Sequence, residues 1–131
     1  MQKCFFDTSI TSLSIPLKLV DLKDCWSNEV PLLKNISISV KNPRYICSNK
    51  YVFGKSNLKN DDYDTLEFAC KDIEIAKIPS FINKITSCAF RDCQLLQSVE
   101  FSTDSKLEII DYFAFFNSSI QSFSLPPSVK V

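Results

Sequence analysis

The chain of 131 residues contains no histidine and a single glycine, Gly54. Without histidine it lacks the base of Ser-His-Asp and Cys-His catalysis, and it cannot form any zinc site that uses imidazole. With one glycine it cannot form the glycine-rich loops whose backbone approaches bound phosphates closely. These absences exclude the common catalytic and nucleotide-binding designs. We therefore expect no enzyme activity, no catalytic residue, no metal and no cofactor.

An excess of either charge is also absent, because Lys and Arg total 15 and Asp and Glu total 15. This balance argues against nucleic-acid binding, which requires a basic surplus or a basic patch. No stretch approaches the roughly 18 uninterrupted apolar residues of a membrane-spanning helix. The first residues, Met1 to Asp7, lack the apolar segment of a signal peptide.

What the chain does contain is a repeated unit. Ala89-Phe90 and Ala114-Phe115 each open a copy, and an apolar triplet spaced by three and then two residues follows each pair. Five such triplets occur in the chain: Ile10, Leu13, Ile15; Leu33, Ile36, Ile38; Ile73, Ala76, Ile78; Leu96, Val99, Phe101; and Ile120, Phe123, Leu125. Their third members are 23, 40, 23 and 24 residues apart. A regular spacing of this kind is the mark of a stacked-repeat protein.

The spacing within the triplet predicts a strand. Its last two members are two residues apart and so point to one face of a strand. In three copies a proline follows, and proline ends the strand because it has no N–H to donate. One unit cannot bury its apolar side alone, so we expect the units to stack into a right-handed coil with one parallel sheet. The predicted strands lie near 12–15, 35–38, 75–78, 98–101 and 122–125.

The interval of 40 residues holds an insertion of about 17 residues relative to the other repeats. We expect a β-hairpin there, with Tyr51–Phe53 paired to Leu66–Ala69 and a polar, acidic loop from Gly54 to Thr65 between them. Helix is expected only as single turns, near 87–92 and 111–115. The expected organisation is one domain whose repeats lie near 4–25, 26–45, 46–88, 89–113 and 114–131.

The repeats also resemble a known family. Residues 89–101, AFRDCQLLQSVEF, and residues 78–90, IPSFINKITSCAF, look like the leucine-rich repeats of the BspA-like surface antigens of bacteria and anaerobic protists. The long repeat is similar to the elongated, hairpin-bearing repeat of that family. The resemblance covers nearly the whole chain. It implies an α/β-class leucine-rich repeat solenoid that is mostly β, surface display, and adhesion or protein binding. It implies no catalytic residue.

Two groups of side chains have competing interpretations. Six cysteines, none in a C-x-x-C pattern, are interpreted chiefly as buried free thiols, with disulfides or a metal site as alternatives: Cys4, Cys25, Cys47, Cys70, Cys88 and Cys93. Asp61, Asp62 and Asp64 could suggest a calcium loop. They lack the glycine and the terminal glutamate of the EF-hand pattern, so a solvated loop is the better interpretation.

The outward positions of the predicted strands form the candidate partner-binding surface, which we call the strand face. In repeat solenoids such rows line the face used for binding, although they could simply solvate the sheet. The strand face consists of Ser12, Ser14, Asn35, Ser37, Lys77, Ser98, Glu100, Ser122 and Ser124. Its expected ligand is a protein or a host-surface or matrix molecule of unknown identity.

Two function classes remain open at this point. The first is a non-enzymatic adhesion or interaction module at the cell surface, and the second is an intracellular scaffold or a truncated gene remnant. The chain starts and ends within a repeat, which favours a fragment of a longer array. Apolar residues at the two ends, including Phe5, Leu13 and Ile15 and then Phe123, Leu125 and Val129, lead us to expect head-to-tail self-association.

Overall fold

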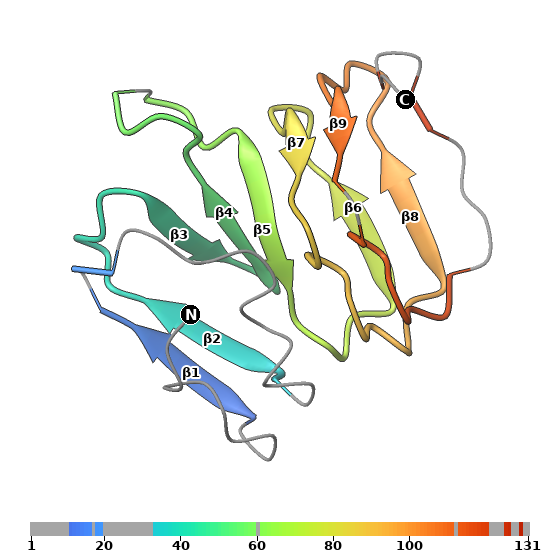
Figure 1. The fold of residues 1–131 in the computed structure, drawn as a ribbon, viewed down its shortest axis with the longest axis horizontal. Coiled ribbons are helices and arrows are strands. Elements are labelled where there is room, and N and C mark those ends of the chain that lie inside the picture. The colour runs from blue at the N-terminus through green and yellow to red at the C-terminus, as the bar shows by residue number, and fades with distance from the viewer. Residues whose placement is uncertain are drawn as a thin grey trace.

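The computed structural model describes residues 11–16, 18–19, 33–59, 61–111, 113–120, 125–126 and 129. These residues form short strands stacked side by side, and no helix is found among them (Figure 1). Single helical turns were expected near 87–92 and 111–115, and the described residues of these ranges form isolated turns instead. Arg91 N donates to Cys88 O at 3.2 Å, and Ala114 N donates to Asp111 O at 3.2 Å. The fold is therefore a mostly β solenoid.

Four of the five predicted strands are present at the predicted residues. They are β1 (Ser12–Ile15), β2 (Asn35–Ile38), β6 (Ile75–Ile78) and β8 (Ser98–Phe101). β1 pairs with β2 and β6 pairs with β8, both parallel, and each register aligns the triplet members of one repeat with those of the next. The fifth predicted strand, near 122–125, falls largely on residues outside the described part of the chain.

A second row of strands runs along another side of the coil. It consists of β5 (Thr65–Ala69), β7 (Lys84–Ile85) and β9 (Ile109–Ile110), which pair in parallel in that order. The apolar residues that follow Pro79 explain this row. Ile85 in β7 and Ile82 just before β7 are both fully buried, so they hold the row against the core. The two repeats that begin with β6 and β8 thus each contribute one strand to each row.

The insertion changes the expected sheet. β3 (Tyr45–Ser48), β4 (Tyr51–Gly54) and β5 form an antiparallel meander, so the predicted hairpin between β4 and β5 is confirmed. However, β5 also belongs to the second row, so the hairpin is part of a five-stranded mixed sheet and does not stand apart. Within the described ranges, the expected single parallel sheet is present as two parallel pairs on either side of the insertion.

Side chains of the insertion cap the strand edges that this interruption exposes. The Cys47 thiol donates to the carbonyl of Ile36 on β2 at 3.1 Å. On the other side, the backbone N–H of Lys77 on β6 donates to the Tyr51 hydroxyl at 3.0 Å. Because an edge strand presents unpaired backbone groups, these bonds supply some of the partners that a neighbouring strand would otherwise provide.

The core is divided into two apolar clusters by β4. Tyr51 and Phe53 point into the larger cluster, which includes the buried triplet members of β6 and β8. Val52 points the opposite way, into the smaller cluster beneath β1 and β2. This division follows from the alternation of side chains along a strand. It makes β4 buried on both faces.

The apolar ends differ from expectation on one side. Ile15, expected on an open face, is only 2% exposed and belongs to the smaller cluster, and Leu13 packs against that cluster. Leu125 is exposed, and Val129 packs partly against the larger cluster. Phe5 and Phe123 lie outside the described residues. The part of the first repeat that the structure describes therefore covers its apolar residues.

Candidate functional site

Most of the strand face that the structure describes is exposed. Its described members are exposed, except Ser98, which is half-buried: Ser12, Ser14, Asn35, Ser37, Lys77, Ser98 and Glu100. Ser122 and Ser124 lie outside the described residues. Because the insertion separates β2 from β6, the structure gathers these residues into two patches.

The first patch is polar and uncharged. The register places Ser12 beside Asn35 and Ser14 beside Ser37, and the two serine hydroxyls of the second pair hydrogen-bond at 2.9 Å. A shallow depression of about 310 Å³ lies over β1 and β2 at these residues. Hydroxyls and a carboxamide can bind polar groups of a partner by exchanging hydrogen bonds, and this patch offers no titratable group.

The second patch combines opposite charges with an apolar side chain. Lys77 on β6 is aligned with Glu100 on β8, and Ile75 is aligned with Ser98. Ile75 leaves half of its surface in water. An exposed apolar residue gains stability when a protein partner covers it, and a neighbouring cation and anion fix the orientation of that partner.

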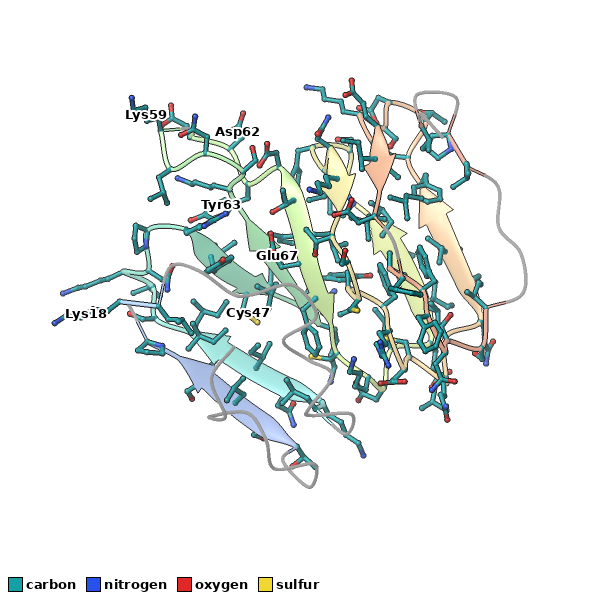
Figure 2. The ribbon with its side chains drawn as sticks, viewed as in Figure 1. Lys18, Cys47, Lys59, Asp62, Tyr63 and Glu67 are labelled. Atoms are coloured by element: carbon teal, nitrogen blue, oxygen red, sulfur yellow. The ribbon has the colours of Figure 1, made fainter. Side chains whose placement is uncertain are left out.

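Sequence reasoning missed a depression at the insertion, which we call the insertion pocket. It has a volume of about 360 Å³. Its lining combines apolar and aromatic side chains with two carboxylates: Ile46, Ser48, Phe53, Asp61, Asp62, Tyr63 and Phe81. Figure 2 shows Asp62 and Tyr63 at the end of the loop that joins β4 to β5. The sequence predicts that the aspartates lie in a polar loop, but no periodicity links them to Phe81, which follows β6.

The structure also reveals a buried lysine. Lys71, only 6% exposed, donates to the carbonyl of Arg91, and its ammonium lies 5.1 Å from the centre of the Phe68 ring. Burial lowers the pKa of Lys71. The ring and the carbonyl partly replace the water that this ammonium loses.

A depression of about 420 Å³ beside Lys71 is lined by side chains of both charges. Its acids already have partners. Asp72 pairs with Lys50 at 3.2 Å, and the Asn117 amide donates to Asp92 at 2.7 Å. No periodic pattern in the sequence distinguishes Lys71 from the exposed lysines.

The described cysteines correct part of the thiol prediction. Cys47, Cys70 and Cys93 are free, and the last two are buried. Cys88, expected among the free thiols, is disulfide-bonded. Among the described residues, no group of three or more Cys, Asp or Glu side chains is placed to hold a metal ion.

Burial controls the ionisation of these thiols. It raises the pKa of Cys70 to about 11 and that of Cys93 to about 12, and it also raises the pKa of the half-buried Cys47. Since the thiolate is the reactive form, both buried thiols stay protonated and unreactive near neutral pH. Neither buried thiol suits nucleophilic chemistry near neutral pH.

Thiol labelling tests this arrangement. We expect Cys47 to react with Ellman's reagent at pH 8 well before Cys70 and Cys93, which should react fully only after denaturation. The order follows from exposure and from the raised pKa values, so native labelling of the buried pair should accelerate as the pH rises toward 11. Peptide mapping of the labelled chain gives the labelling rate of each cysteine. Equal native rates for Cys93 and Cys47 would contradict the buried placement.

Comparison with known proteins identifies the repeat. The family model described as the BspA type leucine rich repeat region matches residues 1–65 and 63–131, with six copies. No curated protein sequence matches the chain. The described part of the chain contains no helix with the length and apolarity that crossing a membrane requires.

Solved structures with the same fold include three bacterial proteins. The pneumococcal vaccine antigen PcpA aligns over 92% of this chain at 21% identity, with a TM-score of 0.78. A leucine rich cell surface protein from Faecalibacterium prausnitzii aligns over 98% at 23% identity, with a TM-score of 0.79. A leucine-rich repeat protein from Eubacterium ventriosum aligns over 82% at 20% identity, with a TM-score of 0.70. This chain covers 29%, 33% and 27% of them, respectively.

Proposed function

Because the chain belongs to the family of BspA type leucine-rich repeat regions, we propose that it is a non-catalytic protein-binding module of a surface adhesion protein. The family supports a repeat-based interaction role. The finer proposal, that the module acts at the cell surface in adhesion, draws support from the solved relative described as a cell surface protein. The chain spans about a third or less of the solved proteins that it resembles, so it would act as one part of a longer protein.

The observation that carries this proposal is the exposed strand face. Parallel pairing holds Lys77 and Glu100 side by side on rigid strands, with Ile75 exposed next to Lys77. Sites on regular elements are held more precisely than sites on loops, so little ordering is required when a partner binds. The absence of histidine in the whole chain, and the raised pKa values of the buried thiols, favour binding over catalysis.

A double charge removal tests the role of this face. We expect Lys77→Ala with Glu100→Ala to weaken binding to a purified extracellular-matrix protein at least tenfold, a loss of about 1.4 kcal/mol. The free energy of unfolding should change by less than about 0.5 kcal/mol, because both side chains are exposed. Binding to a panel of immobilised matrix proteins, measured by surface plasmon resonance, gives the first value and urea denaturation gives the second.

The matched control removes another exposed pair of opposite charges, with Asp104→Ala and Lys106→Ala, in the segment between β8 and β9. This variant should bind like the unchanged chain. Failure of the unchanged chain to bind any matrix protein would overturn the adhesion proposal. Binding that survives the Lys77 and Glu100 changes but is lost when residues 55–64 are replaced would move the site from the strand face to the insertion.

A further inference from the structure

The insertion pocket is built from three separate segments of the chain. Ile46 and Phe53 are paired across β3 and β4, so their side chains share one face of the hairpin. Phe81, from the turn after β6, meets Phe53 edge to face with ring centres 5.6 Å apart. Tyr63 and its neighbours in the loop before β5 complete the lining. The hairpin insertion and the repeat that follows it therefore both contribute to this pocket.

Apolar surface remains in water inside the insertion pocket. Ile46 is 41% exposed and Phe81 is 44% exposed, although the larger core cluster lies directly beneath Phe53. Isolated exposed apolar residues are ordinary, but here two of them share a concave lining with Tyr63. This lining can stabilise a ligand that has an apolar section.

Two carboxylates set the charge of the insertion pocket. Asp61 and Asp62 are exposed on its lining, and neither forms an ion pair with a cation in the described part of the chain. Asp64 differs, because it accepts hydrogen bonds from the backbone N–H and the hydroxyl of Ser56, at 2.8 and 2.5 Å. Lys55 places its ammonium 5.0 Å from the centre of the Tyr63 ring. Lys55 therefore lies against Tyr63 and pairs with neither aspartate. Among the described residues, the carboxylates of Asp61 and Asp62 remain free to bind a ligand.

We propose that the insertion pocket binds an arginine side chain of a partner protein. The methylene groups of arginine would lie against Ile46, Phe53 and Phe81, and its guanidinium would reach Asp61 and Asp62. Arginine fits better than lysine because its planar fork bonds carboxylates in a bidentate manner and stacks on aromatic rings. The volume of about 360 Å³ accommodates one long side chain and lies at the low end of the range for ligand pockets. This surface is separate from the strand face, so the inference stands or fails independently of the function proposed above.

Side-chain analogues test the chemistry directly. The purified chain is titrated with n-butylguanidinium, with n-butylammonium as the lysine analogue, and with n-butylurea, a planar and neutral isostere of the guanidinium, while backbone amide resonances are followed by NMR. We expect saturable shifts at Ile46, Phe53, Asp62 and Phe81 in the millimolar range, with n-butylurea at least fivefold weaker. Binding of n-butylguanidinium should weaken as sodium chloride is raised from 10 to 300 mM, because salt screens the exposed carboxylates.

Paired variants separate charge from shape. Asp61→Asn with Asp62→Asn should bring n-butylguanidinium down to the affinity of n-butylurea, whereas Asp104→Asn, an exposed aspartate elsewhere, should leave both affinities unchanged. Phe81→Ala should weaken both analogues. The amide spectrum of each variant checks that the fold is intact. Equal affinity of the unchanged chain for n-butylguanidinium and n-butylurea, an unaffected guanidinium affinity in the double variant, tighter binding of n-butylammonium, or no binding at all would each overturn the proposal.

Discussion

Replacing Phe90 with alanine is expected to lower the free energy of unfolding by about 3–5 kcal/mol. Phe90 is completely buried, and its ring stacks on that of Phe115 in the next repeat, with centres 4.8 Å apart and planes 6° from parallel. Its backbone N–H also donates to the carbonyl of Ala114 at 2.7 Å. Removing the ring would leave a cavity where successive turns of the solenoid stack. A domain of this size has a stability of about 5–15 kcal/mol, so much of it depends on this contact.

Urea denaturation measures the effect, and Phe116→Ala is the matched control. Phe116 lies in the same turn as Phe115 but is 47% exposed, with Arg91 over its ring at 4.6 Å. Its ring also meets that of Phe113 edge to face at 5.3 Å, so its loss should cost about 1–2 kcal/mol, the value of an exposed cation–π contact plus an aromatic pair. Similar losses for the two variants would show that the stacked pair does not hold the repeats together.

The strands of the solenoid were predictable because the physics that sets them is local. Spacings of three and two residues place apolar side chains on one strand face, and the following proline ends the strand. Hence β1, β2, β6 and β8 begin and end where the triplets indicated. The positions between the triplet members followed from the same alternation, so the described residues of the strand face lie at exposed positions, apart from the half-buried Ser98.

The connections that depend on packing between distant segments were not predictable. Within the insertion, the pairing of β4 with β5 could still be predicted, because two apolar runs of the sequence indicate it. The capping bonds from Cys47 to Ile36 and from Lys77 to Tyr51 depend on where the hairpin lies against the coil. Those bonds join the insertion to β2 and β6, the two strands between which the parallel sheet is interrupted.

The same limit applies to the insertion pocket and to Lys71. Phe81 reaches the pocket from the turn after β6, so only the folded chain places it beside the loop that carries Asp61 and Asp62. Lys71 looks like any surface lysine in the sequence, and only the folded chain buries it beside the Arg91 carbonyl and the Phe68 ring. A periodic sequence thus predicts the scaffold well and predicts poorly the irregular segments that the scaffold supports.

Asn42 lies in one of these irregular segments. Removing its side chain should have the second largest effect on stability among the proposed substitutions. The side chain is buried, and its amide nitrogen donates to the carbonyls of Pro16 and Leu19 at 2.9 and 2.8 Å. Its oxygen accepts from the backbone N–H groups of Arg44 and Tyr45, both at 2.9 Å. One carboxamide therefore joins the turn after β1 to the start of the insertion.

Asn42→Ala is expected to lower the free energy of unfolding by about 2–4 kcal/mol, because buried backbone donors and acceptors would lose their partners. The matched control is Asn57→Ala. Asn57 is exposed and accepts a single hydrogen bond, from the N–H of Lys59 at 2.9 Å, so its loss should cost less than about 1 kcal/mol. Urea denaturation of both variants gives the comparison. A cost below about 1 kcal/mol for Asn42→Ala would mean that water or a local shift satisfies the freed groups.

Asn42→Asp then separates the hydrogen bonds that Asn42 donates from those that it accepts. An ionised carboxylate can still accept from Arg44 and Tyr45, but it meets the carbonyl oxygens of Pro16 and Leu19 with no hydrogen to donate. The folded chain should therefore favour the protonated acid and hold its pKa above the unfolded value of about 3.9. Stability lost at neutral pH should partly return as the pH falls toward about 4, because the folded state binds the proton more tightly. The unchanged chain has no carboxyl at this position, so it should show no such gain, and a pH-independent loss in the Asp variant would place the cost in packing rather than in the missing donor.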